Sequence, residues 1–195
     1  MKLIRKTKWY TLEVKLDNTN DIDYNIIHLA TNFNFMCYNL TLCSEITDTS
    51  VRLLGHVHYL CLYACNKITD KSVKMLGNVN FLNLSRCYNI TDESVRKLRN
   101  VSSLNLSFCN KITNDLIKWL VHIYTLCLCS CSKIEYMSGV ILENVRHANL
   151  VWCNIKTDDS VKLFGDAEIL KLFECNKIVV VNVDIQKNNR ITIKI

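Results

Sequence analysis

The apolar positions of this chain recur every 22 residues, and residues 79–100 show the unit well. Within it, Leu82-Asn83-Leu84 alternates apolar and polar residues, as a half-buried strand does. Val95 and Leu98, three residues apart, place one apolar stripe on a short helix. Each unit therefore predicts a strand, a turn, a short helix and a return to the next strand.

Cysteine and leucine mark the repeat over seven copies. The columns are Cys43, Cys65, Cys87, Cys109, Cys131, Cys153 and Cys175, and Leu40, Leu62, Leu84, Leu106, Leu128, Leu150 and Leu172. A fixed period in this range indicates a solenoid. One unit cannot bury its apolar face alone, but a stack of units can, so we expect a continuous core along the stack.

The ends of the short helices carry recognisable residue types. Thr91-Asp92 is a helix-start signal, because either side chain can accept a hydrogen bond from the free N–H groups of a first turn. In three copies a glycine follows the last apolar residue of the helix, at Gly55, Gly77 and Gly165. We expect these glycines to end their helices in the left-handed conformation.

The line L-x-L-x-x-C-x-x-I-T-D-x-S-V-x-x-L resembles the cysteine-containing leucine-rich repeat, which is typical of the substrate-recognition domains of F-box proteins. The resemblance covers about residues 37–177. It implies an α/β leucine-rich-repeat solenoid, a right-handed β-α superhelix shaped like the ribonuclease-inhibitor horseshoe, with parallel strands on its concave face. It also implies non-catalytic protein recognition, with substrate selection in ubiquitin ligation as one such role. Residues 1–36 do not resemble an F-box, so that role would need an adaptor.

The two ends of the chain depart from the repeat, as end repeats do. We interpret residues 1–36 as a degenerate capping repeat with a first strand and helix, 37–177 as the repeats and 178–195 as a strand cap. Ile191-Thr192-Ile193 lies 21 residues after Leu170-Lys171-Leu172, which predicts a last parallel strand. A terminal β-hairpin is the alternative. With no proline to mark a linker, we expect residues 1–195 to form a single domain.

The residues that flank the inward leucines of each strand form the predicted concave face, and they stack at about 4.8 Å from one repeat to the next. Charge is almost absent there, and aromatic and small polar residues are common, as in the core of protein interfaces. The alternative is that asparagine and serine merely cover an exposed sheet. The candidate partner-binding residues are Tyr59, Tyr63, Phe81, Asn83, Asn105, His147 and Phe173.

A second candidate surface follows the buried valine of each helix by one residue. Five of its six positions are basic: Arg52, Lys74, Arg96, Lys118 and Lys162, with Val140 as the sixth. This basic column is either a solvated convex face or an electrostatic footprint for an acidic partner or nucleic acid. No nucleic-acid-binding motif accompanies it, so a protein is the favoured partner.

The composition of the chain limits which class of protein and which cellular compartment we expect. The chain has 195 residues, 49% of them hydrophobic, and a formal net charge of +6. The basic amino-terminus has no apolar core of a secretory signal, and no apolar run is long enough to span a membrane. Seven of the eleven cysteines fall in one buried column, which favours free thiols and a cytoplasmic protein. We expect Cys87 and Cys109 to be inert, and the concave Cys61, Cys127 and Cys129 to be exposed and reactive.

No catalytic or cofactor-binding pattern is recognisable. The chain lacks a Gly-rich phosphate loop, a nucleophile elbow and a metalloprotease helix. The thiols of Cys127, Cys129 and Cys131 do not have the spacing of a zinc knuckle. We therefore expect no enzyme activity, no cofactor and no metal.

Overall fold

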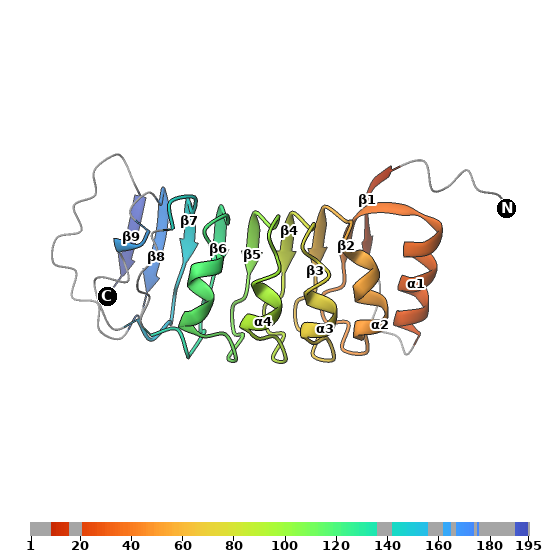
Figure 1. Ribbon diagram of the computed structural model, residues 1–195, viewed down its shortest axis with the longest axis horizontal. Coiled ribbons are helices and arrows are strands. Elements are labelled where there is room, and N and C mark those ends of the chain that lie inside the picture. Colours follow the sequence, from red (N-terminus) through yellow and green to blue (C-terminus); the bar gives the residue numbers. More distant parts are fainter. Residues whose placement is uncertain are drawn as a thin grey trace.

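The strands of the chain form one open parallel sheet, in the order in which they occur along the sequence (Figure 1). The computed structural model describes residues 9–15, 21–135, 142–155, 162–164, 167–173, 175 and 190–194. Within this part there are nine strands: β1 (Trp9–Lys15), β2 (Asn34–Asn39), β3 (Tyr59–Cys61), β4 (Phe81–Asn83), β5 (Ser103–Asn105), β6 (Thr125–Cys127), β7 (His147–Asn149), β8 (Ile169–Phe173) and β9 (Arg190–Lys194).

Helices alternate with the strands and lie in a row on one side of the sheet (Figure 1). They are α1 (Ile22–Asn32), α2 (Asp48–Val51), α3 (Asp70–Val73) and α4 (Asp92–Val95), with 3-10 helices η1 (Arg52–Leu54) and η2 (Asn114–Trp119). An open parallel sheet in which each strand from β1 to β5 is followed by a helix is the predicted α/β solenoid. The first such unit contains β1 and α1, and β1 pairs with β2 of the next unit.

The strand register confirms the predicted 22-residue step. Tyr59 pairs with Phe81, and Phe81 pairs with Ser103, so equal repeat positions lie side by side from β2 to β8. At the carboxyl end, Leu170 pairs with Ile191 in a parallel arrangement. Strand β9 is therefore the closing parallel strand that the sequence predicts. The other strand of the alternative hairpin, before Lys187, lies outside the described residues.

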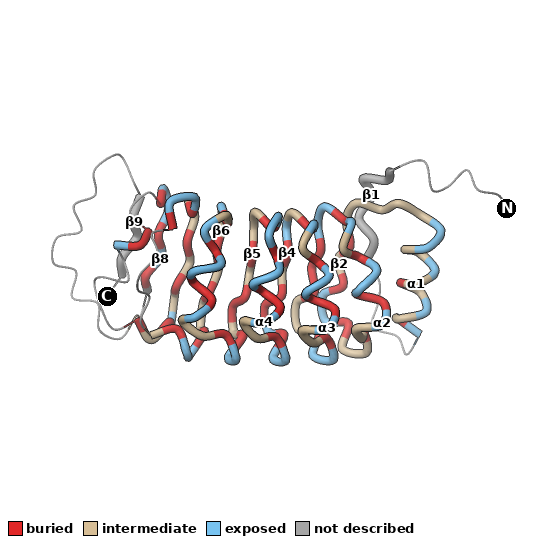
Figure 2. The backbone as a smooth tube through the Cα atoms, in the orientation of Figure 1, coloured by how far each residue is buried: buried red, intermediate tan, exposed pale blue. Residues whose placement is uncertain are grey.

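Over the residues whose burial is described, one core runs from Ile22 in α1 to Leu172 in β8 (Figure 2). In the repeat of β4, the side chains of Leu84, Cys87, Ile90, Val95 and Leu98 are at most 1% exposed. These are the positions that the sequence pattern assigns to the interior. The predicted division into inward leucines, a turn anchor and a helix stripe is therefore correct.

The column cysteines do more than fill space. The Cys87 thiol donates to the Leu62 carbonyl at 3.0 Å, and the Cys109 thiol donates to the Leu84 carbonyl at 3.2 Å. Cys65, Cys131, Cys153 and Cys175 make the equivalent bond. Each thiol thus donates to a backbone carbonyl oxygen of the preceding repeat. An aliphatic side chain at the same position could not donate to that oxygen. Burial raises the pKa of Cys109 to about 12, so the thiol stays protonated and keeps its donor.

The Thr-Asp pairs at the starts of α2, α3 and α4 each connect two repeats. The Thr91 hydroxyl accepts from the Glu93 N–H at 3.2 Å, so threonine is the N-cap. The Asp70 carboxylate instead accepts from the N–H and hydroxyl of Thr91, at 2.9 and 2.6 Å. Asp23, Asp48 and Asp92 bond the next threonine in the same way. These aspartates form a ladder of bonds between repeats, which the sequence reading did not include.

The prediction for the glycines is wrong. Gly55 has φ −65°, which is right-handed backbone. A Cβ atom on Gly55 would lie 2.3 Å from the Met75 carbonyl oxygen, and one on Gly77 would lie 2.8 Å from that of Lys97. Glycine is required at both positions because the backbone of the next repeat passes too close for a side chain. Gly165 lies outside the described residues.

Left-handed backbone occurs elsewhere, shortly after each strand from β2 to β7. The residues there are Leu42, Ala64, Arg86, Phe108, Ser130 and Trp152, with φ between 56° and 63°. We call this set the left-handed column. Its N–H groups bond the neighbouring repeat; for example, the Arg86 N–H donates to the Ser107 carbonyl at 2.9 Å. This bond between repeats holds the conformation, which is uncommon for residues other than glycine.

Candidate functional site

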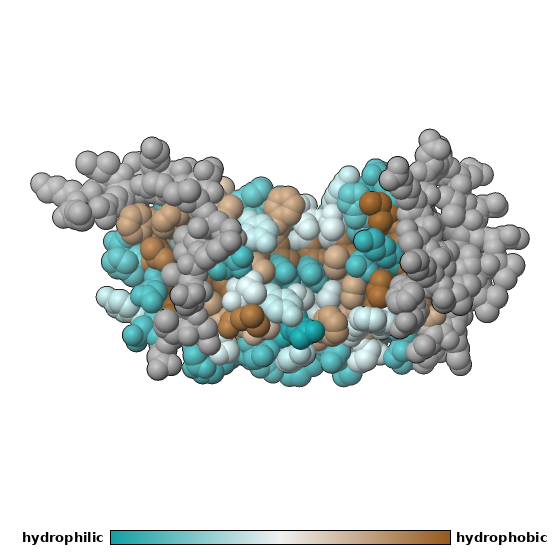
Figure 3. Space-filling view, turned by 180° about the vertical axis from the view of Figure 1, so that it is seen from behind, coloured by the Kyte–Doolittle hydropathy of each residue, from teal (hydrophilic) through white to brown (hydrophobic). Residues whose placement is uncertain are grey.

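The predicted concave surface is the side of the sheet opposite the helices, and we call it the strand face. Figure 3 shows it between the two grey ends of the molecule, with hydrophilic and hydrophobic side chains interspersed. Three columns of residues make it up. They are Cys37 to Ile169, Asn39 to Lys171 and Thr41 to Phe173, each in steps of 22.

The first column carries the exposed aromatic side chains. Tyr59 is 37% exposed and Phe81 is 40% exposed, and they are partners in the register of β3 and β4. The Phe81 ring meets the His58 ring edge-on, with centroids 5.1 Å apart. At the other end of the column, Ile169 is 37% exposed. The structure thus brings Tyr59 and Phe81 together as an aromatic pair on adjacent strands.

His147 also lies in this column and is half-buried. Its ring meets the Tyr124 ring edge-on at 5.4 Å, and its Nε2 lies 3.8 Å from a carboxylate oxygen of Glu168. Phe173 belongs to the third column, at the end of β8, but its side chain lies outside the described part of the chain.

The asparagines of the second column are partly structural. Asn83 Oδ1 accepts from the Ser85 N–H at 3.0 Å and from the Ser85 hydroxyl at 2.6 Å. Asn105 Oδ1 accepts from the Ser107 N–H at 2.9 Å. An asparagine that bonds the backbone two residues ahead forms an Asx turn. Asn83 and Asn105 therefore shape the exit from the strand as well as contributing to the strand face.

The cysteines of the strand face are less accessible than predicted. Cys61 is only 5% exposed, so the expectation that it is exposed is wrong. Its sulfur lies 3.2 Å from the Thr41 hydroxyl of the preceding repeat, which helps to cover it. Cys127 and Cys129 are half-buried, and burial raises the pKa of Cys127 to about 11.

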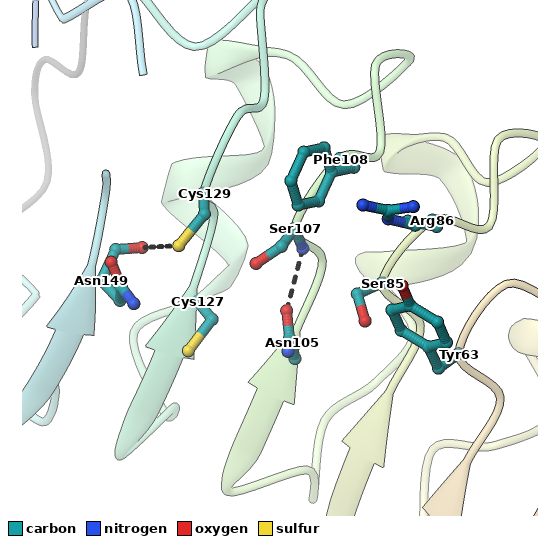
Figure 4. A pocket seen from close by; sticks show the side chains of 9 residues that line it. All are labelled: Tyr63, Ser85, Arg86, Asn105, Ser107, Phe108, Cys127, Cys129 and Asn149. Carbon is teal, nitrogen blue, oxygen red and sulfur yellow. Dashed lines mark hydrogen bonds between the residues drawn. The ribbon is translucent and has the colours of Figure 1, made fainter. Parts of the chain in front are cut away.

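An open pocket of about 300 Å³ lies at the carboxyl ends of the strands (Figure 4). Its nine lining residues come from five consecutive repeats. Tyr63, predicted as a binding residue, lines it together with Arg86 and Phe108, which the sequence reading missed. The Arg86 guanidinium lies between the two rings, with Cζ 5.7 Å from the Tyr63 centroid and 4.8 Å from the Phe108 centroid.

Arg86 and Phe108 were missed because strand alternation assigns only every second residue to the strand face. Both belong to the left-handed column, where the turn redirects the side chain. In the sequence, Arg86 and Phe108 occupy the same repeat position, 22 residues apart. No glycine occurs at that position in the described repeats to indicate a left-handed turn. A left-handed residue is predicted mainly from glycine or asparagine.

The basic column lies on the helix side, away from the strand face. Arg52, Lys74, Arg96 and Lys118 are all exposed, at the ends of successive short helices, and Lys162 is exposed as well. The Lys118 ammonium lies 5.8 Å from the centroid of the Trp119 ring. Val140 lies outside the described residues.

Among the described residues, no group of three or more His, Cys, Asp or Glu side chains could hold a metal ion. Over the same part of the chain, no helix is long and apolar enough to cross a membrane. The eleven cysteines are free.

Comparison with known proteins supports the fold. No protein-family model matches the chain, and no curated protein is significantly similar to it. Among solved structures, it is similar to one chain of the crystal structure of a Rad7 and Elc1 complex in yeast, with a TM-score of 0.57 and 17% identity. The likeness covers 87% of this chain and 43% of that chain, so this chain spans less than half of its length. The protein has the fold of a leucine-rich-repeat solenoid.

Proposed function

We propose that this protein is a non-catalytic protein-binding module whose strand face contacts the partner. The observation that carries the proposal is the aromatic pair, Tyr59 and Phe81, exposed side by side on a face with almost no charge. Binding hot spots favour aromatic side chains, and solenoids use extended faces of this kind for recognition. The paired strands hold the backbone of both residues in place, which lowers the entropy lost on binding.

The proposal has a narrower form, in which the partner is a substrate selected for ubiquitin ligation through an adaptor. Two observations support it. The repeat resembles that of F-box protein recognition domains, and the similar solved structure is itself a complex of two proteins. The eleven free cysteines suit a reducing compartment such as the cytoplasm.

Comparative affinity capture from the native cell tests the proposal. The baits are the parent protein, a Tyr59→Ala/Phe81→Ala variant and a Lys74→Glu/Arg96→Glu variant. Each aromatic anchor should contribute more than about 1 kcal/mol to binding. We therefore expect a protein that the parent and the charge-reversed variant both enrich, and that the aromatic variant loses.

The two variants serve as controls for each other, since one alters the strand face and the other the helix side. All four side chains are exposed, so both variants should keep the circular dichroism spectrum and urea midpoint of the parent. If the partner stays with the aromatic variant but leaves the charge-reversed one, the binding surface is on the helix side and the proposal is wrong.

A second candidate function is a scaffold that binds an acidic protein or nucleic acid through the basic column. The observation that favours it is the alignment of four exposed cations on successive helices. Such binding would weaken steeply with salt, and Lys74→Glu with Arg96→Glu would flatten that dependence. Binding to RNA or DNA that is unchanged by this double reversal would exclude the basic column as the site.

A further inference from the structure

Arg86 is held in a defined position at the pocket of the strand face. Its backbone is fixed, because φ is 59° and its N–H donates to the Ser107 carbonyl. Arg86 is exposed, and its guanidinium lies between the rings of Tyr63 and Phe108 (Figure 4). An arginine between two aromatic rings loses little further side-chain freedom when it binds a ligand.

The fold does not require an arginine at this position. The left-handed column accepts Leu42, Ala64, Phe108, Ser130 and Trp152 in the other described repeats, and none of these is charged. The main-chain bond of Arg86 to Ser107 uses no side-chain atom. The left-handed turn therefore does not explain why position 86 carries a positive charge.

The pocket offers Arg86 no anion of its own. Arg86 is the only Lys, Arg, Asp or Glu among the nine described residues that line the pocket. Cys127 remains a neutral thiol near pH 7, because burial raises its pKa to about 11. The remaining lining residues are serine, asparagine, cysteine and the two aromatic residues. The pocket thus carries one positive charge and an otherwise neutral wall.

The geometry and volume of the site limit the kinds of ligand that it can bind. A guanidinium stacked on aromatic rings keeps the N–H groups of its edge available for planar, two-point bonding to a carboxylate. The volume of about 300 Å³ lies at the lower end of the range for small-ligand pockets, about 300–1,000 Å³. It has room for a side chain of a partner, and its one cation balances one carboxylate.

We propose that this pocket binds the side-chain carboxylate of one aspartate or glutamate in a protein partner. The inference rests on the proposed function and makes it more specific, since it gives the recognised segment an acidic residue. The aromatic pair lies on the strands and the pocket at their carboxyl ends. A segment that crosses the strand face would place an apolar residue on Phe81 and an acidic one beside Arg86.

Selection from a phage-displayed library of random decapeptides tests the inference. The baits are the parent protein, Arg86→Gln and, as a matched loss of one charge on the helix side, Lys74→Gln. We expect parent-selected peptides to share one acidic position, and Lys74→Gln to select the same peptides. Arg86→Gln should lose the acidic preference. Arg86→Lys, which keeps the charge but not the two-point geometry, should fall between parent and Arg86→Gln.

The best parent-selected peptide and its acid-to-amide version are then titrated against parent and Arg86→Gln. The amide should weaken binding to the parent about ten- to a hundredfold, the range for a hydrogen-bonded charged pair, and should make little difference with Arg86→Gln. A library without binders, binders without an acidic position, or an amide effect that survives Arg86→Gln would overturn the inference. Urea midpoints equal to that of the parent establish that the variants are folded.

The same peptides separate this inference from the proposed function. If binders lack an acidic residue but lose affinity for a Phe81→Ala variant, the strand face remains the binding surface and only the carboxylate site is overturned. If the selected peptides are insensitive to Phe81→Ala and to Arg86→Gln alike, the proposed function fails as well.

Discussion

Replacing Asp48 should weaken the stack of repeats by an amount that depends on pH. Its carboxylate accepts from the Thr69 N–H at 2.8 Å, and from the hydroxyls of Thr69 and Ser72 at 2.6 Å each. Hydrogen bonds to a charged group contribute about 1.5–3 kcal/mol each. Asp48 is only partly buried, and the Ser72 hydroxyl can turn to the Thr69 carbonyl at 3.4 Å. We therefore expect Asp48→Ala to lower the free energy of unfolding by about 2–4 kcal/mol.

Asp48→Asn is the matched control, and the chain itself supplies the precedent. Asn114 occupies the equivalent position in a later repeat, where its Oδ1 accepts from the Glu135 N–H at 2.9 Å. Asparagine keeps one acceptor but loses the charge. Asp48→Asn should therefore cost about 1 kcal/mol, less than alanine.

The pH dependence follows from the pKa of Asp48. Burial acts to raise this pKa, but the hydrogen bonds from Ser72 and Thr69 outweigh burial and hold it below the ordinary value of 3.8. A carboxyl group with a lowered folded-state pKa stabilises the protein above its unfolded-state pKa, and this contribution is lost as pH falls through the folded-state pKa. The stability difference between the parent and Asp48→Asn should thus be constant near pH 7 and shrink below about pH 4.

Urea unfolding followed by far-UV circular dichroism, repeated from pH 7 to pH 3, measures both effects. The reasoning is refuted if Asp48→Asn costs as much as Asp48→Ala at pH 7. It is also refuted if the difference between the parent and Asp48→Asn does not change with pH, since the ladder would then not act through the carboxylate charge.

Two further predictions concern the core. Leu106→Ala should lower the free energy of unfolding by about 2–5 kcal/mol, because Leu106 is fully buried in the central repeats. Met75→Ala, at a 57% exposed position, should change it by less than about 0.5 kcal/mol. Equal losses of stability in urea unfolding would argue against a continuous core. In native thiol labelling followed by mass spectrometry, half-buried Cys129 should react well before Cys87, whose burial raises its pKa; labelling of Cys87 without unfolding would contradict the assigned burial.

Much of the fold could be predicted because the 22-residue period fixes which residues stack. Once Leu82 and Leu104 were assigned to equal positions, their pairing in the sheet followed, and the structure shows it. The closing strand could be predicted in a similar way, since Leu170 pairs with Ile191, the residue that lies 21 positions later in the matching sequence pattern. Periodicity carries this information without any knowledge of side-chain contacts.

The bonds between repeats could not be predicted, because the sequence shows residue types but not the distances between copies. Thr91-Asp92 was predicted as a helix start, and α4 does begin at Asp92. The sequence could not show that the Asp92 carboxylate also bonds Thr113, which is 21 residues further along the chain. Gly55 was misinterpreted for a similar reason: a close approach by the Met75 carbonyl leaves no trace in the sequence around Gly55.

The candidate site was predicted in part. Tyr59 and Phe81 could be placed on one face because strand alternation is reliable within a strand. Beyond the strand the alternation ends, and the left-handed turn brings Arg86 to the pocket. Nothing in the residue type of Arg86 indicates positive φ, so its place beside Tyr63 required the structure.

Hydroxyl-radical footprinting of the captured partner complex tests the central claim most directly, because it compares the two faces within one sample. Tyr59 and Phe81 are 37% and 40% exposed on the strand face, while Met75 and Trp119 are 57% and 45% exposed away from it. We expect partner binding to protect Tyr59 and Phe81 from oxidation and to leave Met75 and Trp119 unchanged. Protection of Met75 and Trp119 with unchanged oxidation of Tyr59 and Phe81 would contradict recognition by the strand face.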